Sequence, residues 1–409
     1  MLRVPTIAVT TRHSPSLYPW QCSPGMSCPG PLIGLDRLAD AALFACDPWE
    51  LYAAGVITSP NMLVLGQIGT GKSALVKTYL RRQLLAGRQV AVLDPKGEYA
   101  ALAEHAGLTH VALAPGGPDR LNPLDPPPGE PPEGVARHRA GLVAALAASG
   151  LGRDLQPEER AALAAAVSDL TVNAVLGDVI GRLLEPDDGV ARSLATTPQA
   201  LAAAVRPLAL ELRRLLDGDL GGMLDATSTV ALDADGPGLV VDVSAVFGTE
   251  AIGPVMTCVG AWLSRVIARG GGRQRILVVD EAWALLGRVG TTRWLQSVAK
   301  LARTYGVQLV VVTHRLSDLT AQADAGTESE RQALGLLSDT DIRVVYRQPV
   351  AERDAAARLL GLTIAEADLV TRLPAHRALW KLGRHVAVVD HLLASDDGPI
   401  VDTDARMQS

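Results

Sequence analysis

One short segment constrains the fold of this chain more than any other: Gly66-Gln67-Ile68-Gly69-Thr70-Gly71-Lys72-Ser73, which fits G-x-x-x-x-G-K-[ST] at every fixed position. An apolar run at 61–65 precedes it, and a predicted helix follows from about 72 to 86. Glycines let the backbone curl so that successive N–H groups point at phosphate oxygens, and a helix N-terminus adds its positive dipole end. The segment therefore predicts a loop that binds the phosphates of a nucleoside triphosphate.

The residue types in this glycine loop suggest separate roles. Lys72 is expected to reach the β- and γ-phosphates, and Ser73 to ligate Mg²⁺. The predicted nucleotide-binding residues of the loop are Gly66, Gly69, Thr70, Gly71, Lys72, Ser73 and Ala74.

A second acidic motif follows the apolar run Ile276-Leu277-Val278-Val279, which predicts a buried strand. Asp280, at its carboxyl end, is expected to hold the hydration shell of Mg²⁺. Glu281 is expected to polarise the attacking water as a general base. Such endings are common at strand tips, so the assignment depends on the glycine loop upstream.

Three further groups of polar residues are candidates, each with a plainer alternative. Asp94 and Glu98 follow a predicted strand and are expected to face the nucleotide, or else to cap the next helix. His314 ends another strand and is a candidate sensor of the γ-phosphate, or part of a surface turn. Candidates for an arginine finger are Arg303, Arg343 and Arg347, although each alone is also typical of a helix end or a surface cation.

Alternating strand and helix signals predict an α/β fold with a mostly parallel sheet covered by helices. The proline-rich stretch at 125–132 interrupts them, and helical spacing without strand signals follows at about 134–149, 157–177 and 197–217. The expected organisation is a lead-in at 1–45, a first core part at 46–125, an all-helical insertion at 126–222, a second core part at 223–391 and an acidic polar tail at 392–409.

The amino-acid composition limits the kinds of partner that the chain is expected to bind. The net charge is −6 and aromatic residues make up only 3% of the chain, whereas dedicated nucleic-acid binders show a basic excess and stacking side chains. The four cysteines, Cys22, Cys28, Cys46 and Cys258, lack metal-ligand spacing and are expected to be reduced thiols. No apolar run approaches the length that spans a bilayer, and no secretory signal is recognised, so a cytoplasmic protein is expected.

Several strings together resemble one family. In chain order they are the glycine loop, Asp94-Pro95-Lys96-Gly97-Glu98-Tyr99, Leu121-Asn122-Pro123-Leu124, Asp280-Glu281-Ala282-Trp283, Arg303 with Tyr305-Gly306, and Thr313-His314. Over roughly residues 45–405 the chain resembles the HerA–FtsK superfamily, and within it the TraC-like ATPases of type IV secretion and bacterial conjugation. In that family the glycine loop is the Walker A motif and the Asp280-Glu281 pair belongs to the Walker B motif.

The resemblance implies a RecA-like ATPase core with an all-α insertion, using ATP and Mg²⁺. It implies a homo-hexamer with ATP at subunit interfaces, and membrane-embedded secretion-channel subunits as partners at the inner face of the membrane. A DNA or protein substrate is compatible with the family but is not indicated by the charge.

The chain departs from the family in two places. The sensor strand usually ends in Thr-Gln, whereas His314 stands here, and such ATPases often carry a further N-terminal domain. Because this chain begins just before the ATPase core, a truncated gene product, a split subunit or a compact variant is expected. The lead-in strings also resemble forms found in actinobacterial members. Two alternatives to a secretion ATPase remain at this point: a DNA translocase or DNA-processing ATPase of the same superfamily, and a non-hydrolysing nucleotide-gated scaffold.

Overall fold

The computed structural model describes residues 29–126, 131–218, 220–229, 236–269, 273–282, 295–296, 298–300, 305–314, 335 and 337–402. The chain divides into two compact units. Unit 1 comprises Met1–Gly87, Val312–Ser317 and Leu337–Ser409, and unit 2 comprises Arg88–Val311 and Asp318–Leu336. Among the described residues, no helix has both the length and the apolar character needed to cross a membrane.

The sheet of unit 1 is built from β3 (Met62–Leu65), which leads into the glycine loop and is buried along its whole length. β3 pairs in parallel with β9 (Ile342–Val345). From β9 the sheet continues as an antiparallel ribbon through β10 (Arg377–Leu382), β11 (His385–His391), β1 (Leu32–Asp36) and β2 (Ala42–Ala45).

The described helices of unit 1 flank these strands. They are α1 (Pro48–Ala53), α2 (Lys72–Leu85), η2 (Val350–Glu352), α14 (Arg353–Leu360), α15 (Ile364–Val370) and α16 (Gly398–Val401). Only α2 begins at the glycine loop, so its position determines where the loop's backbone amides point.

Unit 2 has a parallel sheet of aliphatic strands. Its strands are β4 (Gln89–Asp94), β5 (Thr109–Ala112), β6 (Gly238–Asp242), β7 (Arg275–Val279) and β8 (Val307–Thr313), of which β8 ends in unit 1. The strands β4, β7 and β8 are buried throughout, as is usual for parallel strands covered on both faces. The connecting elements are α3 (Ala100–Ala106), η1 (Ser244–Val246) and α9 (Ile252–Arg269).

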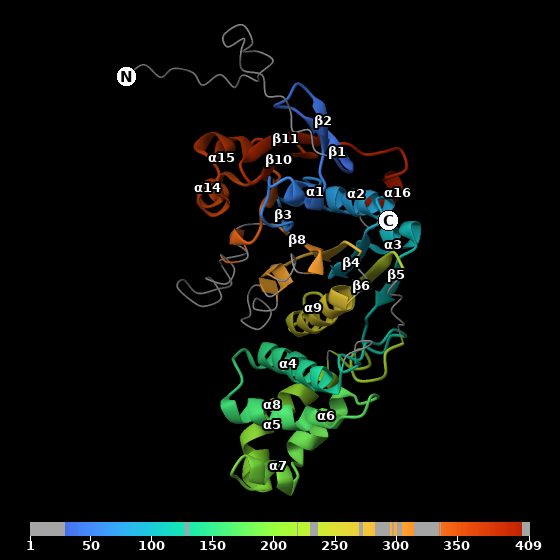
Figure 1. Cartoon of the computed structure of the whole chain (residues 1–409), viewed down its shortest axis with the longest axis vertical. Coiled ribbons are helices and arrows are strands. Elements are labelled where there is room, and N and C mark those ends of the chain that lie inside the picture. The colour runs from blue at the N-terminus through green and yellow to red at the C-terminus, as the bar shows by residue number, and fades with distance from the viewer. Residues whose placement is uncertain are drawn as a thin grey trace, which may run out of the picture. The chain divides into compact units, whose positions relative to one another are not determined.

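Within the described residues, the strands form an 11-stranded sheet in the order β2-β1-β11-β10-β9-β3-β8-β7-β4-β6-β5 (Figure 1). The pairings β3–β9, β7–β8, β4–β7, β4–β6 and β5–β6 are parallel. The predicted α/β class with a mostly parallel sheet is therefore confirmed. The antiparallel ribbon was not expected.

Between β5 and β6, unit 2 contains the helical insertion. Its helices are α4 (Pro132–Leu151), α5 (Pro157–Ser168), α6 (Leu176–Leu184), α7 (Asp188–Ser193) and α8 (Pro198–Asp217), and α4 packs against α9 (Figure 1). The single helix expected at 157–177 is wrong, because α5 ends at Ser168 and α6 starts at Leu176. The intervening Thr171-Val172-Asn173 consists of poor helix formers.

Asn122, from the Asn-Pro-Leu string, connects the insertion to the sheet layer. Its buried side-chain amide donates to Ala174 O at 2.9 Å and to Asp125 Oδ1 at 2.8 Å, and its oxygen accepts from Leu124 N at 3.0 Å. Arg139, on α4, donates to Leu124 O at 2.8 Å. The string therefore has a structural role in seating the insertion.

Both ends of the described chain are more ordered than the sequence suggested. The lead-in expected at 1–45 contains the strands β1 and β2 within residues 32–45, and neither strand was predicted. The expected polar tail is wrong for its first part, because Asp397 and Ile400 are buried and α16 forms. Nothing in the sequence indicated that two carboxylates of this segment pair with the basic face of α2.

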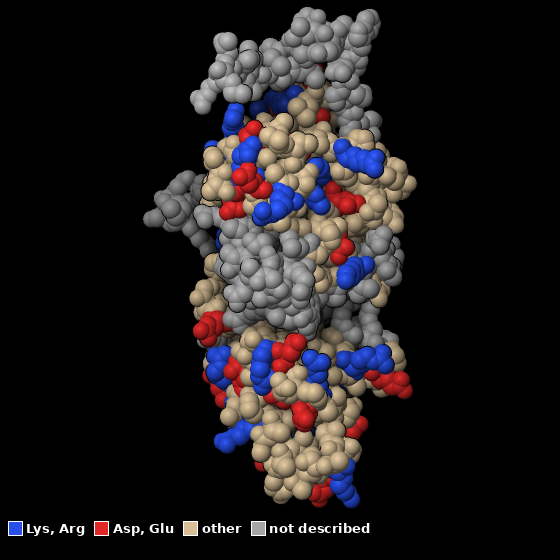
Figure 2. Space-filling view, turned by 90° about the vertical axis from the view of Figure 1, so that its left-hand side faces the viewer, with Lys and Arg blue, Asp and Glu red and all other residues tan. Residues whose placement is uncertain are grey.

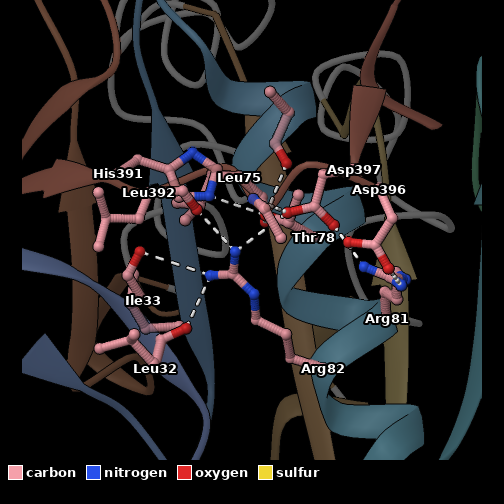
Figure 3. Close-up of polar contacts among 12 residues, drawn as sticks. Leu32, Ile33, Leu75, Thr78, Arg81, Arg82, His391, Leu392, Asp396 and Asp397 are labelled. Carbon is pink, nitrogen blue, oxygen red and sulfur yellow. Dashed lines mark hydrogen bonds and ion pairs between the residues drawn. The ribbon is translucent and has the colours of Figure 1, made fainter. Parts of the chain in front are cut away.

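Two arginines on α2 bind this C-terminal segment (Figure 3). Arg82 donates to Leu392 O at 2.6 Å, to Asp397 Oδ2 at 3.1 Å and to Leu32 O at 2.7 Å. Arg81 donates to Asp397 Oδ1 at 2.7 Å and forms an ion pair with Asp396. Because Asp397 is fully buried and both its oxygens are used, the segment holds α2 against β1 and β11.

His391, at the end of β11, completes this contact. Its Nε2 lies 2.8 Å from Thr78 Oγ1, and Thr78 itself donates into its own helix, to Ala74 O at 2.9 Å (Figure 3). The ring therefore donates from Nε2 and is neutral. Burial lowers the pKa of His391 to about 4, and the charges of Arg82 and His376 add to the effect.

This lowered pKa predicts acid sensitivity. The unfolded chain takes up a proton on His391 near pH 6.5, whereas the native state resists protonation until about pH 4. The free energy of unfolding should therefore fall by about 3 kcal/mol as the pH drops through this window. Denaturant unfolding at a series of pH values measures the fall. His391→Gln should flatten the profile, and the exposed His385→Gln should not; identical profiles for the two variants would contradict the assignment.

Candidate functional site

The glycine loop connects β3 to α2, and its glycines are required for different reasons. Gly69 and Gly71 have φ values of +74° and +103°, which favour glycine. A Cβ at Gly66 would lie 2.4 Å from the Cβ of Tyr346, so a side chain there would collide with the segment after β9. No side chain caps the N-terminus of α2. The first-turn N–H groups of a helix have no intrahelical acceptor, so this uncapped end suits an anion.

Lys72 lies folded over this loop. Its Nζ donates to Gly66 O at 2.5 Å and to Gln67 O at 2.9 Å, and the side chain is only 5% exposed. Thr70 Oγ1 also donates to Gln67 O, at 2.7 Å. The ammonium is therefore held by carbonyl groups of the glycine loop, next to the start of α2. Ser73 is half-buried on the first turn of α2, and Ala74 is buried beside it.

In unit 2, two buried carboxylates end neighbouring strands. Asp94 ends β4 and Asp280 follows β7, and the register pairs Leu93 with Val279. Asp280 N donates to Leu93 O at 3.3 Å. Burial, together with the negative charges of Glu281 and Asp94, raises the pKa of Asp280 to about 7, although a hydrogen bond from Tyr99 opposes the shift.

Asp94 organises the turn that follows β4. Its Oδ1 accepts from Lys96 N at 3.0 Å and from Gly97 N at 2.9 Å, and its Oδ2 accepts from Tyr99 N at 2.9 Å. These amides lie in the turn before α3, whose N-terminus has no side-chain cap, so Asp94 stabilises the turn and does not cap the helix. Glu98 is half-buried on the same turn.

This turn presents Lys96 and Tyr99 to the catalytic candidates. The Tyr99 hydroxyl donates to Asp280 Oδ2 at 2.9 Å, and both groups are buried. Lys96 forms an ion pair with Glu281. Both residues lie in the Asp-Pro-Lys-Gly-Glu-Tyr string, but sequence reasoning gave neither of them a role.

Glu281 has an unusual backbone. Its φ is +49°, its side chain is buried, and its N–H donates to Asp280 Oδ1 at 2.8 Å. Left-handed backbone in a non-glycine residue is costly and is found at sites where the surrounding structure enforces it. Here the Asp280 side chain and the ion pair with Lys96 fix the direction of the Glu281 carboxylate.

The three candidates for an arginine finger differ in what the structure shows of them. Arg303 lies outside the described residues. Arg343 donates to the carbonyls of Thr340, Leu360 and Leu337 at 3.2, 2.7 and 3.1 Å, so its guanidinium serves its own unit rather than a neighbouring chain. Arg347 is exposed, and its carbonyl accepts from Gln67 N of the glycine loop at 3.1 Å.

At the end of β8, Thr313 joins His314 as a sensor candidate. His314 is half-buried. The Thr313 hydroxyl is buried and has no hydrogen-bond partner among the described residues. A buried hydroxyl without a partner is costly, which favours a ligand or water at this position.

The cysteines described in the structure are consistent with reduced thiols. Cys46 and Cys258 are buried and not disulfide-bonded, and burial raises the pKa of Cys258 to about 12. Cys22 and Cys28 lie outside the described residues. Among the described residues, no cluster of three or more His, Cys, Asp or Glu residues is arranged as a metal site.

The Tyr99–Asp280 hydrogen bond predicts a stability effect. Tyr99→Phe removes one donor from a buried carboxylate, so the free energy of unfolding at pH 8 should fall by about 1.5–3 kcal/mol. The exposed Tyr52→Phe is the matched control and should change it by less than about 0.5 kcal/mol. Denaturant unfolding measures both, and equal effects of the two substitutions would show that the hydroxyl contributes nothing.

Comparisons with known proteins agree with this geometry. A family model described as the central domain of helicase HerA matches residues 54–180. Among curated proteins, none matches the chain. The structure of VirB4 of Thermoanaerobacter pseudethanolicus superposes with a TM-score of 0.73 at 22% identity, covering 92% of this chain and 99% of that one.

The plasmid coupling protein TrwB is also similar in structure. Its complex with ADP and Mg²⁺ matches with a TM-score of 0.56 at 16% identity, covering 82% of this chain and 86% of TrwB. At such identities the likeness shows the fold, which is that of RecA-like P-loop ATPases. Over residues 54–180 the chain is therefore similar to the central domain of helicase HerA, and its fold is similar to the folds of VirB4 and TrwB.

Proposed function

We propose that this chain is a Mg²⁺-dependent ATPase that energises a conjugative-transfer or type IV secretion machine. The observation that carries the proposal is the glycine loop, in which Lys72 is folded among backbone groups at the uncapped start of α2. The fold shared with VirB4 along 92% of the chain supports the choice of machine. ATP rather than GTP is inherited from the resemblance.

In this proposal the glycine loop and the acidic residues of unit 2 act on the same nucleotide. Lys72 binds the β- and γ-phosphates through its ammonium group. The residues that would hold Mg²⁺ are Ser73 and Asp280, and the ion supplies charge neutralisation on the phosphate oxygens. The donor set fits the ion, because Asp280 is a buried carboxylate crowded by other negative charges and a cation would relieve that repulsion.

Glu281 is the proposed general base. Its carboxylate is fixed in direction by Asp280 and Lys96, which lowers the cost of orienting it toward a water. Because Lys96 occupies the carboxylate, accepting a proton from water requires Glu281 to loosen this ion pair. Thr313 or His314 is proposed to sense the γ-phosphate, and Arg303 and Arg347 are candidates for the arginine finger.

The proposed partners follow from the resemblance. They are further copies of the chain in a homo-hexamer and membrane-embedded channel subunits, with the ATPase at the inner face of the membrane. TrwB is described as a plasmid coupling protein, which keeps DNA translocation as the alternative. On the face shown in Figure 2, the described acidic and basic side chains are interspersed, so this face offers no single-sign field for DNA.

Steady-state hydrolysis tests the proposal. The purified chain should hydrolyse ATP with Mg²⁺, Lys72→Ala should abolish turnover, and Glu281→Gln should lower kcat by about 10²–10⁴-fold while ATP still binds. The matched control is Glu158→Gln, an exposed acid on the insertion, which should leave kcat unchanged.

The other outcomes separate the alternatives. Turnover by Glu281→Gln at the wild-type rate would refute the role of Glu281. Stimulation of turnover many-fold by DNA, with salt-sensitive DNA binding, would favour a translocase. ATP binding without turnover would favour the nucleotide-gated scaffold.

A further inference from the structure

His376 lies directly against the glycine loop, although it is about 300 residues away in sequence. Its backbone N–H donates to Thr70 O at 2.9 Å. A Cβ added at Gly71 would lie 2.9 Å from His376 Nδ1 and 3.3 Å from its Cα. The imidazole therefore packs on the bare backbone of Gly71, immediately before Lys72 and the start of α2.

The backbone of His376 is held in a conformation that side chains disfavour. Its φ is +60°, in the left-handed region. Three contacts enforce it: the bond to Thr70, a bond from His391 N to His376 O at 2.9 Å, and the ion pair of the next residue, Arg377, with Asp390. Among the described residues, Glu281 and His376 are two of the few non-glycine residues with positive φ, and Glu281 is the proposed general base. Enforced strain of this kind is concentrated at functional sites.

Tyr346 and His376 both lie against the glycine loop, but they differ in solvent exposure. Tyr346 lies under Gly66 but is only 1% exposed, so its ring belongs to the core. His376 is exposed. Its imidazole therefore lies at the surface, beside the loop whose amides suit phosphates. When a nucleoside triphosphate occupies such a loop, its nucleoside projects out of the phosphate cradle and needs a surface outside it.

We propose that His376 is the base-contacting residue of this nucleotide site: its imidazole stacks on the purine of the nucleotide whose phosphates bind residues 69–74. This inference rests on nucleotide binding at the glycine loop and is independent of hydrolysis. Its physical basis is base–ring stacking, which tolerates any purine. His376 therefore raises affinity without selecting adenine over guanine.

Calorimetric titration of the full chain with MgATP and with Mg-tripolyphosphate tests the proposal, because tripolyphosphate has no base. His376→Asn removes the ring but tolerates left-handed backbone. It should weaken MgATP binding by about tenfold and leave tripolyphosphate binding within about twofold. His376→Phe keeps the ring and should restore ATP affinity to within about threefold of the wild type. The matched control is His385→Asn, because His385 is an exposed histidine at the start of β11. It should change the affinity for neither ligand.

Three results would overturn the proposal. Equal weakening of both ligands by His376→Asn would show that His376 acts only through the shape of the loop. Unchanged ATP affinity would show that the ring does not meet the base. If the wild-type chain binds neither ligand, the nucleotide site itself is refuted. Binding without turnover would refute the ATPase and leave this inference standing.

Discussion

Burial of like charges at the ends of β4 and β7 is the constraint on which the site depends. Asp280 is buried so completely that its pKa rises to about 7, and Asp94 and Glu281 add negative charge around it. The protein compensates in part with its own donors: backbone N–H groups for Asp94, the Tyr99 hydroxyl for Asp280 and the Lys96 ammonium for Glu281. These donors do not neutralise the group, and a divalent cation is the natural complement. The folded protein therefore carries an unfavourable electrostatic energy at this site, which the binding of a cation can reduce.

The glycine loop depends on a different kind of support, which is steric. Tyr346 packs under Gly66 and His376 packs on Gly71, so the loop is clamped from the segments that follow β9 and precede β10. The helix that the loop starts is held in turn by Arg82 and His391, which connect α2 to β1, β11 and the C-terminal segment (Figure 3). A chain of close contacts thus extends from the C-terminal segment to the phosphate-binding amides. A pre-shaped loop loses less conformational entropy when a ligand binds.

Sequence patterns were sufficient for the parts of this protein that depend on local chemistry. The spacing of Gly66, Gly71, Lys72 and Ser73 predicts the loop, and apolar runs ending in Asp94 and Asp280 predict the strands that carry the acids. Contacts between residues far apart in the sequence could not be predicted from these patterns. Nothing near Leu32 or Asp397 indicates that they meet at Arg82, and nothing near His376 indicates that it touches Gly71. Such contacts depend on topology, here an antiparallel ribbon joined to a parallel sheet, which local periodicity does not encode.

The central proposal, which follows from the two motifs in the sequence, is that the glycine loop and the Asp280-Glu281 pair serve one nucleotide. Amide hydrogen exchange tests it directly, by comparing the free chain, the chain with Mg²⁺ alone, and the chain with Mg²⁺ and a non-hydrolysable ATP analogue. The account predicts that the analogue with Mg²⁺ slows exchange at residues 69–74 and also at residues 280–282, and that Lys72→Ala abolishes both effects. Protection confined to residues 69–74 would contradict it, because the acidic residues would then take no part in binding the nucleotide.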